Sequence, residues 1–224
     1  MQMEKKTALI FGVTGLVGNL LLEELTRTGI YSAIRIFVRQ PTGLSEAGVE
    51  EIITDFGNLD SVSGKISGDD LFICLGTTIR KAGSVANMEK IDRDLPVLIA
   101  ETALRNGTTG AAVVSSIGAN PGSSNYYLRI KGEMEEKIIS LDFPRTVIAR
   151  PSMLLGERKE IRAGEIIGKA VMKTFNPVLT GKLRKYRAIH GKDVARAMII
   201  LLQECQGVRI AESDELQKVA KGKP

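Results

Sequence analysis

Two serines, a tyrosine and a lysine have the types and the spacing to catalyse proton transfer to a carbonyl group. Ser115 and Ser116 end an apolar run, and Tyr127 and Lys131 follow in a segment with helical periodicity. Residues four apart share one face of a helix, one turn from each other. An ammonium beside a phenol favours loss of the phenol proton, so the pair is suited to general acid catalysis. A serine hydroxyl at the strand end would hold the same substrate oxygen.

The start of the chain has the order of elements that a dinucleotide-binding turn requires. An apolar strand, Thr7–Phe11, leads into three glycines spaced by three residues, and a leucine-rich helical segment follows. We expect Gly12 to permit the turn, Gly15 to let a pyrophosphate approach the backbone, and Gly18 to let helix and strand pack closely. The helix N-terminus would attract the phosphates. The turn residues expected to contact the cofactor are Gly12, Thr14, Gly15, Leu16, Val17 and Gly18. Glycines that serve packing alone are the alternative.

The end of the second strand indicates which dinucleotide is bound. An NAD site usually has an acidic residue there to hold the ribose 2′-hydroxyl. Here the strand Ile34–Val38 is followed by Arg39-Gln40-Pro41, with no acid. Because an arginine forms forked contacts with phosphate, Arg39 predicts a 2′-phosphate and therefore NADP(H). A solvated arginine at a strand end is the alternative.

Strands and helices alternate along the rest of the chain, which predicts an α/β fold with a doubly wound parallel sheet. We expect one Rossmann domain over residues 1–224, with a small C-terminal substrate region at about 153–187 and 204–224. A short amphipathic helix is expected near Ile166–Phe175, and a frayed tail at Lys218–Pro224. The other expected strands are Val49–Thr54, Asp70–Leu75, Gly110–Ser115, Arg145–Arg150, Ala188–Ile189 and Val208–Ala211. The other expected helices are Met88–Arg105, Tyr126–Leu141 and Lys192–Gln203. Asp92 or Asp94 is the expected N-cap of the first of these helices.

Composition argues against several other classes of protein. The 224 residues are 43% hydrophobic and 25% charged, as in ordinary globular proteins. The net charge is +5, but the basic residues are dispersed among acids without interleaved aromatics, so we expect no nucleic-acid groove. No apolar stretch approaches the roughly 18 residues of a membrane span. The polar start is unlike a secretory signal, and two cysteines make neither a disulfide framework nor a metal cluster. We therefore expect a cytoplasmic protein without a metal site.

These motifs together resemble the short-chain dehydrogenase/reductase superfamily. The resemblance is narrower to the atypical branch that contains the Tat-interacting-protein-like, metastasis-suppressor-type oxidoreductases, and it covers nearly the whole chain. It rests on the glycine turn, Cys74-Leu-Gly-Thr-Thr78, Ile91-Asp92-Arg93-Asp94, Ser115-Ser116, Tyr127-Leu-Arg-Ile-Lys131-Gly-Glu, Arg150-Pro151-Ser-Met-Leu-Leu155, and Ile189-His190 with Asp193-Val194-Ala195. The resemblance implies NADP(H) binding and a catalytic set of Ser116, Tyr127 and Lys131. Ser116 is preferred to Ser115 because the superfamily's serine is usually the second of such a pair.

The resemblance also implies where other residues contact the cofactor. Arg39 would bind the 2′-phosphate, and Asp55 and Phe56 would lie beside the adenine. The ribose and the nicotinamide side would be lined by Leu75, Gly76 and Thr77, and the nicotinamide ring bordered by Arg150, Pro151 and Ser152. One position departs from the family's pattern: Asp92 stands where many members have an asparagine that supports a water linked to the lysine. A carboxylate there would accept a hydrogen bond from the lysine side and would change the electric field at Tyr127.

Three classes of function follow from this reading. The first is an NADP(H)-dependent reductase of a small carbonyl compound, with Ser-Tyr-Lys catalysis. The second is a regulatory or redox-sensing protein that binds NADPH with little or no turnover, and the third is a sugar epimerase or isomerase. A homodimer is left open. The charge run Glu133, Glu135, Glu136 and Lys137 is expected to be a solvated helix face in which Glu133 pairs with Lys137.

Overall fold

A seven-stranded parallel sheet forms the centre of the protein. The computed structural model describes residues 6–44, 46–156 and 179–222. The strands lie in the order β3-β2-β1-β4-β5-β6-β9, and every neighbouring pair is parallel. Their bounds are β1 Lys6–Phe11, β2 Tyr31–Val38, β3 Val49–Ile53, β4 Asp70–Ile73, β5 Gly110–Val114, β6 Arg145–Arg150 and β9 Gly207–Glu212. The predicted α/β fold with a parallel sheet is confirmed.

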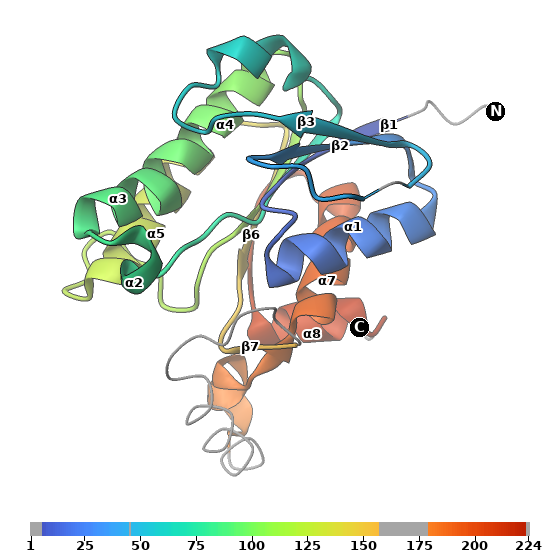
Figure 1. The fold of residues 1–224 in the computed structure, drawn as a ribbon. Helices are drawn as coiled ribbons and strands as arrows, with labels where there is room; N and C mark the ends of the chain where they lie inside the picture. The colour runs from blue at the N-terminus through green and yellow to red at the C-terminus, as the bar shows by residue number, and fades with distance from the viewer. Residues whose placement is uncertain (1–5, 45, 157–178, 223–224) are drawn as a thin grey trace.

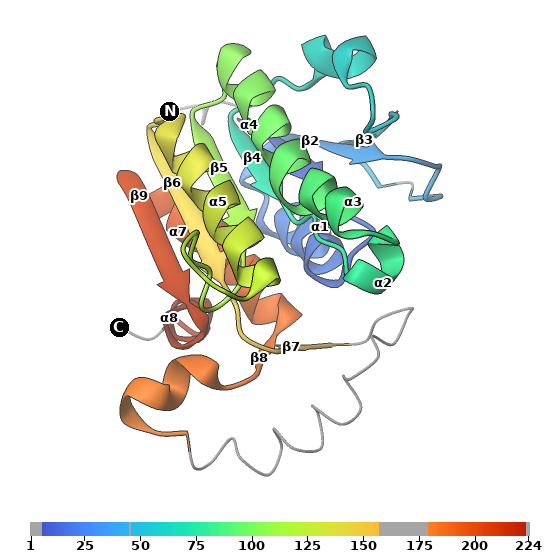
Figure 2. The same cartoon turned by 90° about the vertical axis from the view of Figure 1, so that its left-hand side faces the viewer.

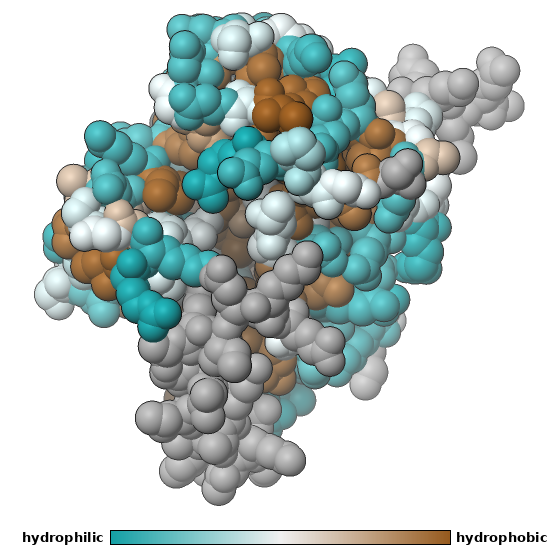
Figure 3. Space-filling view, viewed as in Figure 1, coloured by the Kyte–Doolittle hydropathy of each residue, from teal (hydrophilic) through white to brown (hydrophobic). Residues whose placement is uncertain are grey.

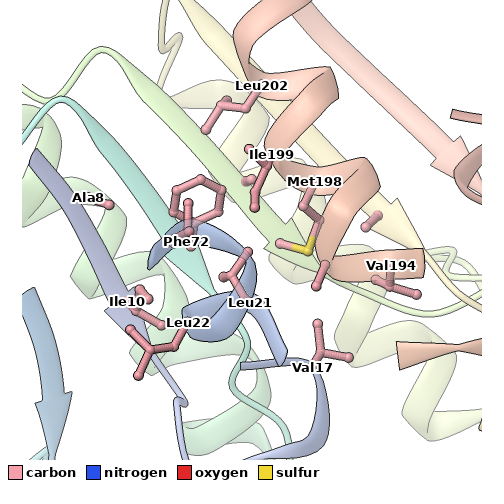
Figure 4. Close-up of a cluster of buried hydrophobic side chains, with 14 of the residues drawn as sticks. Ala8, Ile10, Val17, Leu21, Leu22, Phe72, Val194, Met198, Ile199 and Leu202 are labelled. Atoms are coloured by element: carbon pink, nitrogen blue, oxygen red, sulfur yellow. The ribbon is translucent and has the colours of Figure 1, made fainter. Parts of the chain in front are cut away.

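Helices cover both faces of the sheet (Figures 1 and 2). One face carries α1 (Leu16–Thr28), α7 (Gly191–Glu204) and α8 (Ser213–Ala220), and the other carries α4 (Leu95–Arg105) and α5 (Tyr126–Ser140). Figure 4 shows side chains of α1 and α7 directed toward the sheet, where Leu21 and Met198 lie near Phe72. All three are fully buried, and burying a side chain of this size contributes about 1.5–3 kcal/mol. Packing on both faces explains why the strands are almost continuously apolar.

The order of the strands reverses direction between β1 and β4, and this point determines where a ligand can bind. The chain first winds outward from β1 through β2 to β3, then returns past β1 and continues from β4 to β9. In open parallel sheets, ligands bind in the crevice outside the carboxyl ends of the strands at such a reversal. The glycine turn follows β1 and Cys74 follows β4, so both predicted cofactor segments leave the sheet at this crevice.

The helix predicted over Met88–Arg105 is interrupted. The chain forms α2 (Ile79–Ala82), α3 (Val85–Glu89), one π-helical turn over Lys90–Asp94, and then α4. Asp94, one of the two expected N-cap residues, does occupy the N-cap position of α4, but its side chain forms no capping hydrogen bond. The Asp92 carboxylate instead turns into the protein. Single π-turns inside α-helices occur frequently at functional sites. This one places the Asp92 carboxylate against Lys131 of α5.

The C-terminal part differs from the prediction in two ways. The segment Lys218–Pro224 is not frayed from its start, because α8 runs to Ala220 and buries Leu216. A two-stranded parallel pair, β7 (Leu154–Leu155) and β8 (Ile189–His190), precedes α7, and the 3₁₀ helices are η1 (Asp60–Lys65) and η3 (Gly181–Tyr186). The amphipathic helix expected near Ile166–Phe175 lies outside the described residues. Among the helices described, none is both long and apolar enough to cross a membrane.

Candidate active site

The glycine turn joins β1 to α1 and touches the end of β4. Gly12 has a φ of +91°, which favours glycine, and a Cβ built there would lie 2.6 Å from the carbonyl oxygen of Cys74. A Cβ at Gly18 would lie 2.1 Å from the carbonyl oxygen of Gly12. These two glycines are therefore required by the packing of the turn itself, as predicted for tight turning and close helix–strand contact.

Gly15 has a different environment. It is exposed, and the nearest atom to a Cβ built there is the Gly12 carbonyl oxygen, at 3.3 Å. As the N-cap of α1, Gly15 supplies no side-chain cap, and the first turn of the helix contains no acidic residue. The N-terminal N–H groups and the positive end of the dipole therefore face the crevice without a neutralising group from this turn. Such a cradle fits the pyrophosphate of a dinucleotide.

The predicted Tyr–Lys pair lies on α5, and the loop before the helix packs against its first two turns. The Asn120 N–H donates to the carbonyl oxygen of Leu128 at 3.1 Å, and a Cβ at Gly132 would lie 2.3 Å from the Asn120 carbonyl carbon. This loop begins at Ser116, so the structure brings the strand end and the helix that carries Tyr127 together. Figure 2 shows α5 lying over β5 and β6, with its N-terminal end near the carboxyl ends of the strands.

Lys131 is buried and paired with Asp92. The lysine is 2% exposed and the aspartate is fully buried, and Nζ lies 2.9 Å from Asp92 Oδ1. The other carboxylate oxygen, Oδ2, accepts a hydrogen bond from the Thr77 N–H at 2.9 Å. Asp92 thus ties α5 to the loop that follows β4. This residue is the predicted replacement for the family's asparagine, and the expected contact with the lysine is present.

The charge of Lys131 is stabilised by its neighbours. Burial alone would lower the pKa of Lys131, but the Asp92 carboxylate and the Tyr127 phenol favour the ammonium, and together they hold the pKa above its usual range. The lysine is therefore positively charged at neutral pH. Because the carboxylate occupies one of its three donors, two remain for other partners.

The Lys131 ammonium and the glycine turn flank the same strand end. A Cβ built at Gly76 would lie 3.4 Å from Asp92 Oδ1 and 3.9 Å from Lys131 Nζ, so the backbone after β4 passes directly over the ion pair. The same strand end contacts Gly12 through the carbonyl group of Cys74. Figure 3 shows a hollow near the middle of this side of the molecule, between the part that carries α2 and α3 and the part that carries α1. The dinucleotide turn and the Tyr–Lys pair therefore adjoin one crevice.

The two serines after β5 have different surroundings. Ser115 is buried and its hydroxyl donates to Glu135, whereas Ser116 is half-buried and its only described side-chain hydrogen bond is a long one, 3.5 Å, to the carbonyl oxygen of Ile117. The Ser115 hydroxyl is thus held inside the protein by Glu135, whereas the Ser116 hydroxyl has more freedom to turn toward a ligand. This difference favours the predicted choice of Ser116.

Glu135 corrects the prediction for the charge run on α5. It is 3% exposed rather than solvated, and it accepts hydrogen bonds from Ser115 and from Arg150, whose Nη2 lies 2.5 Å from Oε2. The predicted Glu133–Lys137 pair is also replaced, because Glu133 binds Arg93 at 2.7 Å. Tyr127, Lys131 and Glu135 are spaced by four, so one face of the helix carries all three. Sequence reasoning missed the role of Glu135, although this spacing was a usable signal.

The remaining predicted residues lie around the carboxyl ends of the strands. Arg39 and Asp55 are exposed after β2 and β3, and the half-buried ring of Phe56 lies 6.2 Å from that of Phe11. Pro151 and Ser152 follow β6. Arg150 raises a difficulty for its expected role beside the nicotinamide, since its guanidinium is held by Glu135, whose carboxylate raises the pKa of Arg150. Among the described residues, no group of three or more potential metal ligands gathers in one place.

Comparison with known proteins identifies the family. A family model described as NAD(P)H-binding matches residues 12–204. The chain belongs to this NAD(P)H-binding family. It is 36% identical to Protein HTATIP2 of Rattus norvegicus, in an alignment that covers 75% of this chain and 71% of that protein. The predicted relation to the Tat-interacting-protein-like branch is thereby confirmed.

Two further comparisons extend this picture. The chain is 32% identical to the protein FMP52, mitochondrial, of Eremothecium gossypii, and the alignment covers 96% of this chain and 97% of that protein. Among solved structures, the Bordetella bronchiseptica enzyme WbmH in complex with NAD⁺ superimposes with a TM-score of 0.70 at 12% identity, over 97% of this chain and 80% of that one. The structural likeness supports the Rossmann-type fold.

The comparison with the FMP52 relatives contradicts the prediction that the protein is cytoplasmic. Several fungal relatives that match most of the chain are described as mitochondrial. The prediction rested on the polar residues at the start of the sequence, and that segment alone was not an adequate guide to location.

Proposed function

We propose that the protein is an NADP(H)-dependent oxidoreductase that reduces a small carbonyl compound. The observation that carries this proposal is the contact around Gly76, where the strand end that touches the glycine turn also covers the Lys131 ammonium. A protein that only stores a dinucleotide has no need of a buried cation beside a tyrosine at the same crevice. A reductase needs both a cofactor cradle and a proton donor within reach of one substrate atom.

Each residue has a defined role in this proposal. Ser116 donates a hydrogen bond to the carbonyl oxygen of the substrate, and Tyr127 gives its phenol proton to that oxygen as the alcohol forms. The positive charge of the Lys131 ammonium favours loss of the Tyr127 phenol proton. One of the two remaining N–H donors of Lys131 binds the ribose of the cofactor. Asp92 holds Lys131 in position through the 2.9 Å contact. When bound, NADPH supplies the hydride that is added to the carbonyl carbon.

The preference for NADP(H) over NAD(H) is part of the proposal. Arg39 is exposed directly after β2, and no acid occupies residues 39–41. An exposed arginine is free to form a charge-assisted pair with a 2′-phosphate, which contributes about 1.5–3 kcal/mol. We expect wild type to bind NADPH about 10-fold or more tightly than NADH, and Arg39→Ala to remove that difference without weakening NADH. Titration of both cofactors measures it, and Arg35→Ala, on the same strand but paired with Glu50, is a matched control. Equal affinities in wild type would refute the preference.

A panel of aldehydes and ketones, followed by the loss of NADPH absorbance, tests the activity. A reductase turns over at least one of these compounds, and Tyr127→Phe slows it. Tight NADPH binding with no turnover on any compound would instead support a regulatory protein, in which the Lys131–Asp92 pair is structural. Retention of oxidised cofactor with no net turnover would support an epimerase.

A further inference from the structure

A second cleft lies between η3 and α8, apart from the Tyr127–Lys131 pair. Figures 1 and 2 show η3, the orange helix, beside α8 and beyond the carboxyl ends of β6 and β9. The two helices border a cavity of about 260 Å³. Its described lining consists of Gly181, Arg184, Arg187, Asp214, Gln217 and Lys218. The volume is close to the lower limit for a small-molecule site and is sufficient for part of a ligand.

The charges of this cleft favour an anion. Three of the lining side chains are basic, Arg184, Arg187 and Lys218, and Asp214 is the acid among the described lining. The neighbouring cation Lys185 is already committed, because its Nζ lies 3.0 Å from a carboxylate oxygen of Glu212. An anionic group entering the cleft would therefore meet an excess of positive charge at short range.

Arg187 supplies the more specific observation. Its Nε is buried and has no hydrogen-bond partner within the part of the chain that the structure describes. A buried guanidinium N–H without a partner costs free energy, and a carboxylate or phosphate oxygen is the acceptor whose geometry suits it best. Arg187 thus brings to the lining of the cleft a guanidinium whose hydrogen-bonding capacity the described residues leave unsatisfied.

Hydrogen bonds connect the residues that border the cleft to Ser152, which follows β6 at the edge of the active site. The Ser152 hydroxyl donates to the carbonyl oxygen of Arg187, and the Ser152 N–H donates to Ser213 Oγ at 2.6 Å. Ser213 is the first residue of α8 and directly precedes Asp214. Both walls of the cleft are therefore one hydrogen bond away from Ser152, the residue expected beside the nicotinamide ring. The cleft and the predicted nicotinamide position therefore share Ser152 as a neighbour.

We infer that this cleft binds the anionic group of the carbonyl substrate, so that the enzyme reduces carbonyl compounds that carry a carboxylate or a phosphate. This inference rests on the proposed reductase function and specifies its substrate class. The guanidinium of Arg187 is the principal contact, and Arg184 and Lys218 add positive charge. The anionic group remains unchanged in the reaction, and it places the carbonyl carbon for hydride addition.

Paired substrates that differ only in the anionic group test the inference by activity. Butanal is compared with succinic semialdehyde, and glyceraldehyde with glyceraldehyde 3-phosphate, which separates carboxylate from phosphate. We expect kcat/KM to be about 10- to 100-fold higher for the charged member of at least one pair. Arg187→Ala should raise KM for that compound to the level of its neutral partner, and Lys218→Ala should do so in part. Arg209→Ala is the matched control, because this exposed arginine is paired with Glu215 and is not among the residues that line the cleft. Equal kcat/KM within both pairs in wild type would overturn the inference.

A binding measurement separates this inference from the proposed activity. Calorimetry with succinate and with inorganic phosphate, in the presence of NADP⁺, should show binding to wild type and to Arg209→Ala but not to Arg187→Ala. If no aldehyde is reduced yet this pattern is found, the reductase proposal fails and the anion site stands. If neither anion binds to wild type, the anion site is refuted even where aldehydes are reduced. Arg187→Lys retains the charge and, by partial recovery of binding, shows that loss in the alanine variant is not caused by misfolding.

Discussion

Replacing Asp92 with asparagine should destabilise the protein mainly because it leaves the Lys131 ammonium buried without a counter-charge. The aspartate is fully buried and the lysine side chain is 3% exposed, so water cannot replace the lost partner. Breaking a buried ion pair by removing one member costs about 3–5 kcal/mol, a large part of the roughly 5–15 kcal/mol that stabilises a typical domain. The amide retains the size of the carboxylate, so a packing defect contributes little. Urea denaturation measures the loss in the free energy of unfolding.

A double-mutant cycle shows whether the charge pair is responsible. In Lys131→Met the long apolar side chain keeps the volume, and in the double variant neither charge is buried. We expect the double variant to be more stable than the sum of the single losses predicts, with a coupling energy of about 2–3 kcal/mol. Glu133→Gln is the control, since its partly exposed pair with Arg93 should contribute about 1 kcal/mol or less. Additive losses in the cycle would refute the account of Asp92.

The pH dependence of the same variants gives an independent check. In wild type the pKa of Lys131 is raised, so its favourable contribution is fully present below the ordinary lysine pKa of about 10.4 and is lost only as pH rises through the folded-state value. In Asp92→Asn the largest of the contributions that offset burial is removed, so the pKa of Lys131 should fall, and we expect it to fall below the ordinary value. The penalty then decreases as pH rises toward about 10.4, so the stability gap between variant and wild type should narrow from neutral to alkaline pH. A constant gap would contradict this reasoning.

Two other predictions concern the glycine turn and the support beneath the site. Gly15→Val should lower the thermal midpoint less than Gly18→Ala but abolish its increase on adding NADPH, because the nearest protein atom to the new Cβ is 3.3 Å away and the side chain would occupy the pyrophosphate position. Gly18→Ala should instead lower the midpoint itself, since its Cβ would lie 2.1 Å from a backbone oxygen, and an unchanged midpoint would show that the turn is built differently. Glu135→Gln should cost about 3–5 kcal/mol in urea denaturation by removing the charge that Arg150 binds, and a loss below about 1 kcal/mol would mean that the buried network is unimportant.

The sequence predicted the parallel sheet because its evidence is local. A glycine pattern between an apolar run and a leucine-periodic segment specifies a β-turn-α unit, and the apolar strands repeat the signal. Tyr127 and Lys131 were identified for the same reason, since i and i+4 positions on a helix must share a face. These predictions needed no knowledge of which segments meet in space.

The errors arise where tertiary contacts decide the outcome. Glu135 belongs to a charge run that is typical of a solvated face, and only its meeting with Ser115 and Arg150 makes burial favourable. The contact of Asp92 with Lys131 was expected from the family resemblance and is present, but the π-turn that carries Asp92 was not predicted. The helix α8 was missed because its polar composition concealed one apolar face around Leu216. The preference of Arg39 for NADP(H) stays a prediction.

The most direct test of the central proposal compares Tyr127→Phe with Tyr126→Phe. The two tyrosines are adjacent on α5, and the ring of Tyr126 lies beneath the Arg129 guanidinium, 5.0 Å from it. The decisive measurement is single-turnover hydride transfer from NADPH, together with the dissociation constant of NADPH. The account predicts that Tyr127→Phe binds NADPH nearly as tightly as wild type but transfers hydride about 10²–10⁴-fold more slowly, whereas Tyr126→Phe keeps the wild-type rate. An unchanged rate per folded molecule in Tyr127→Phe would contradict the assignment of Tyr127 as proton donor.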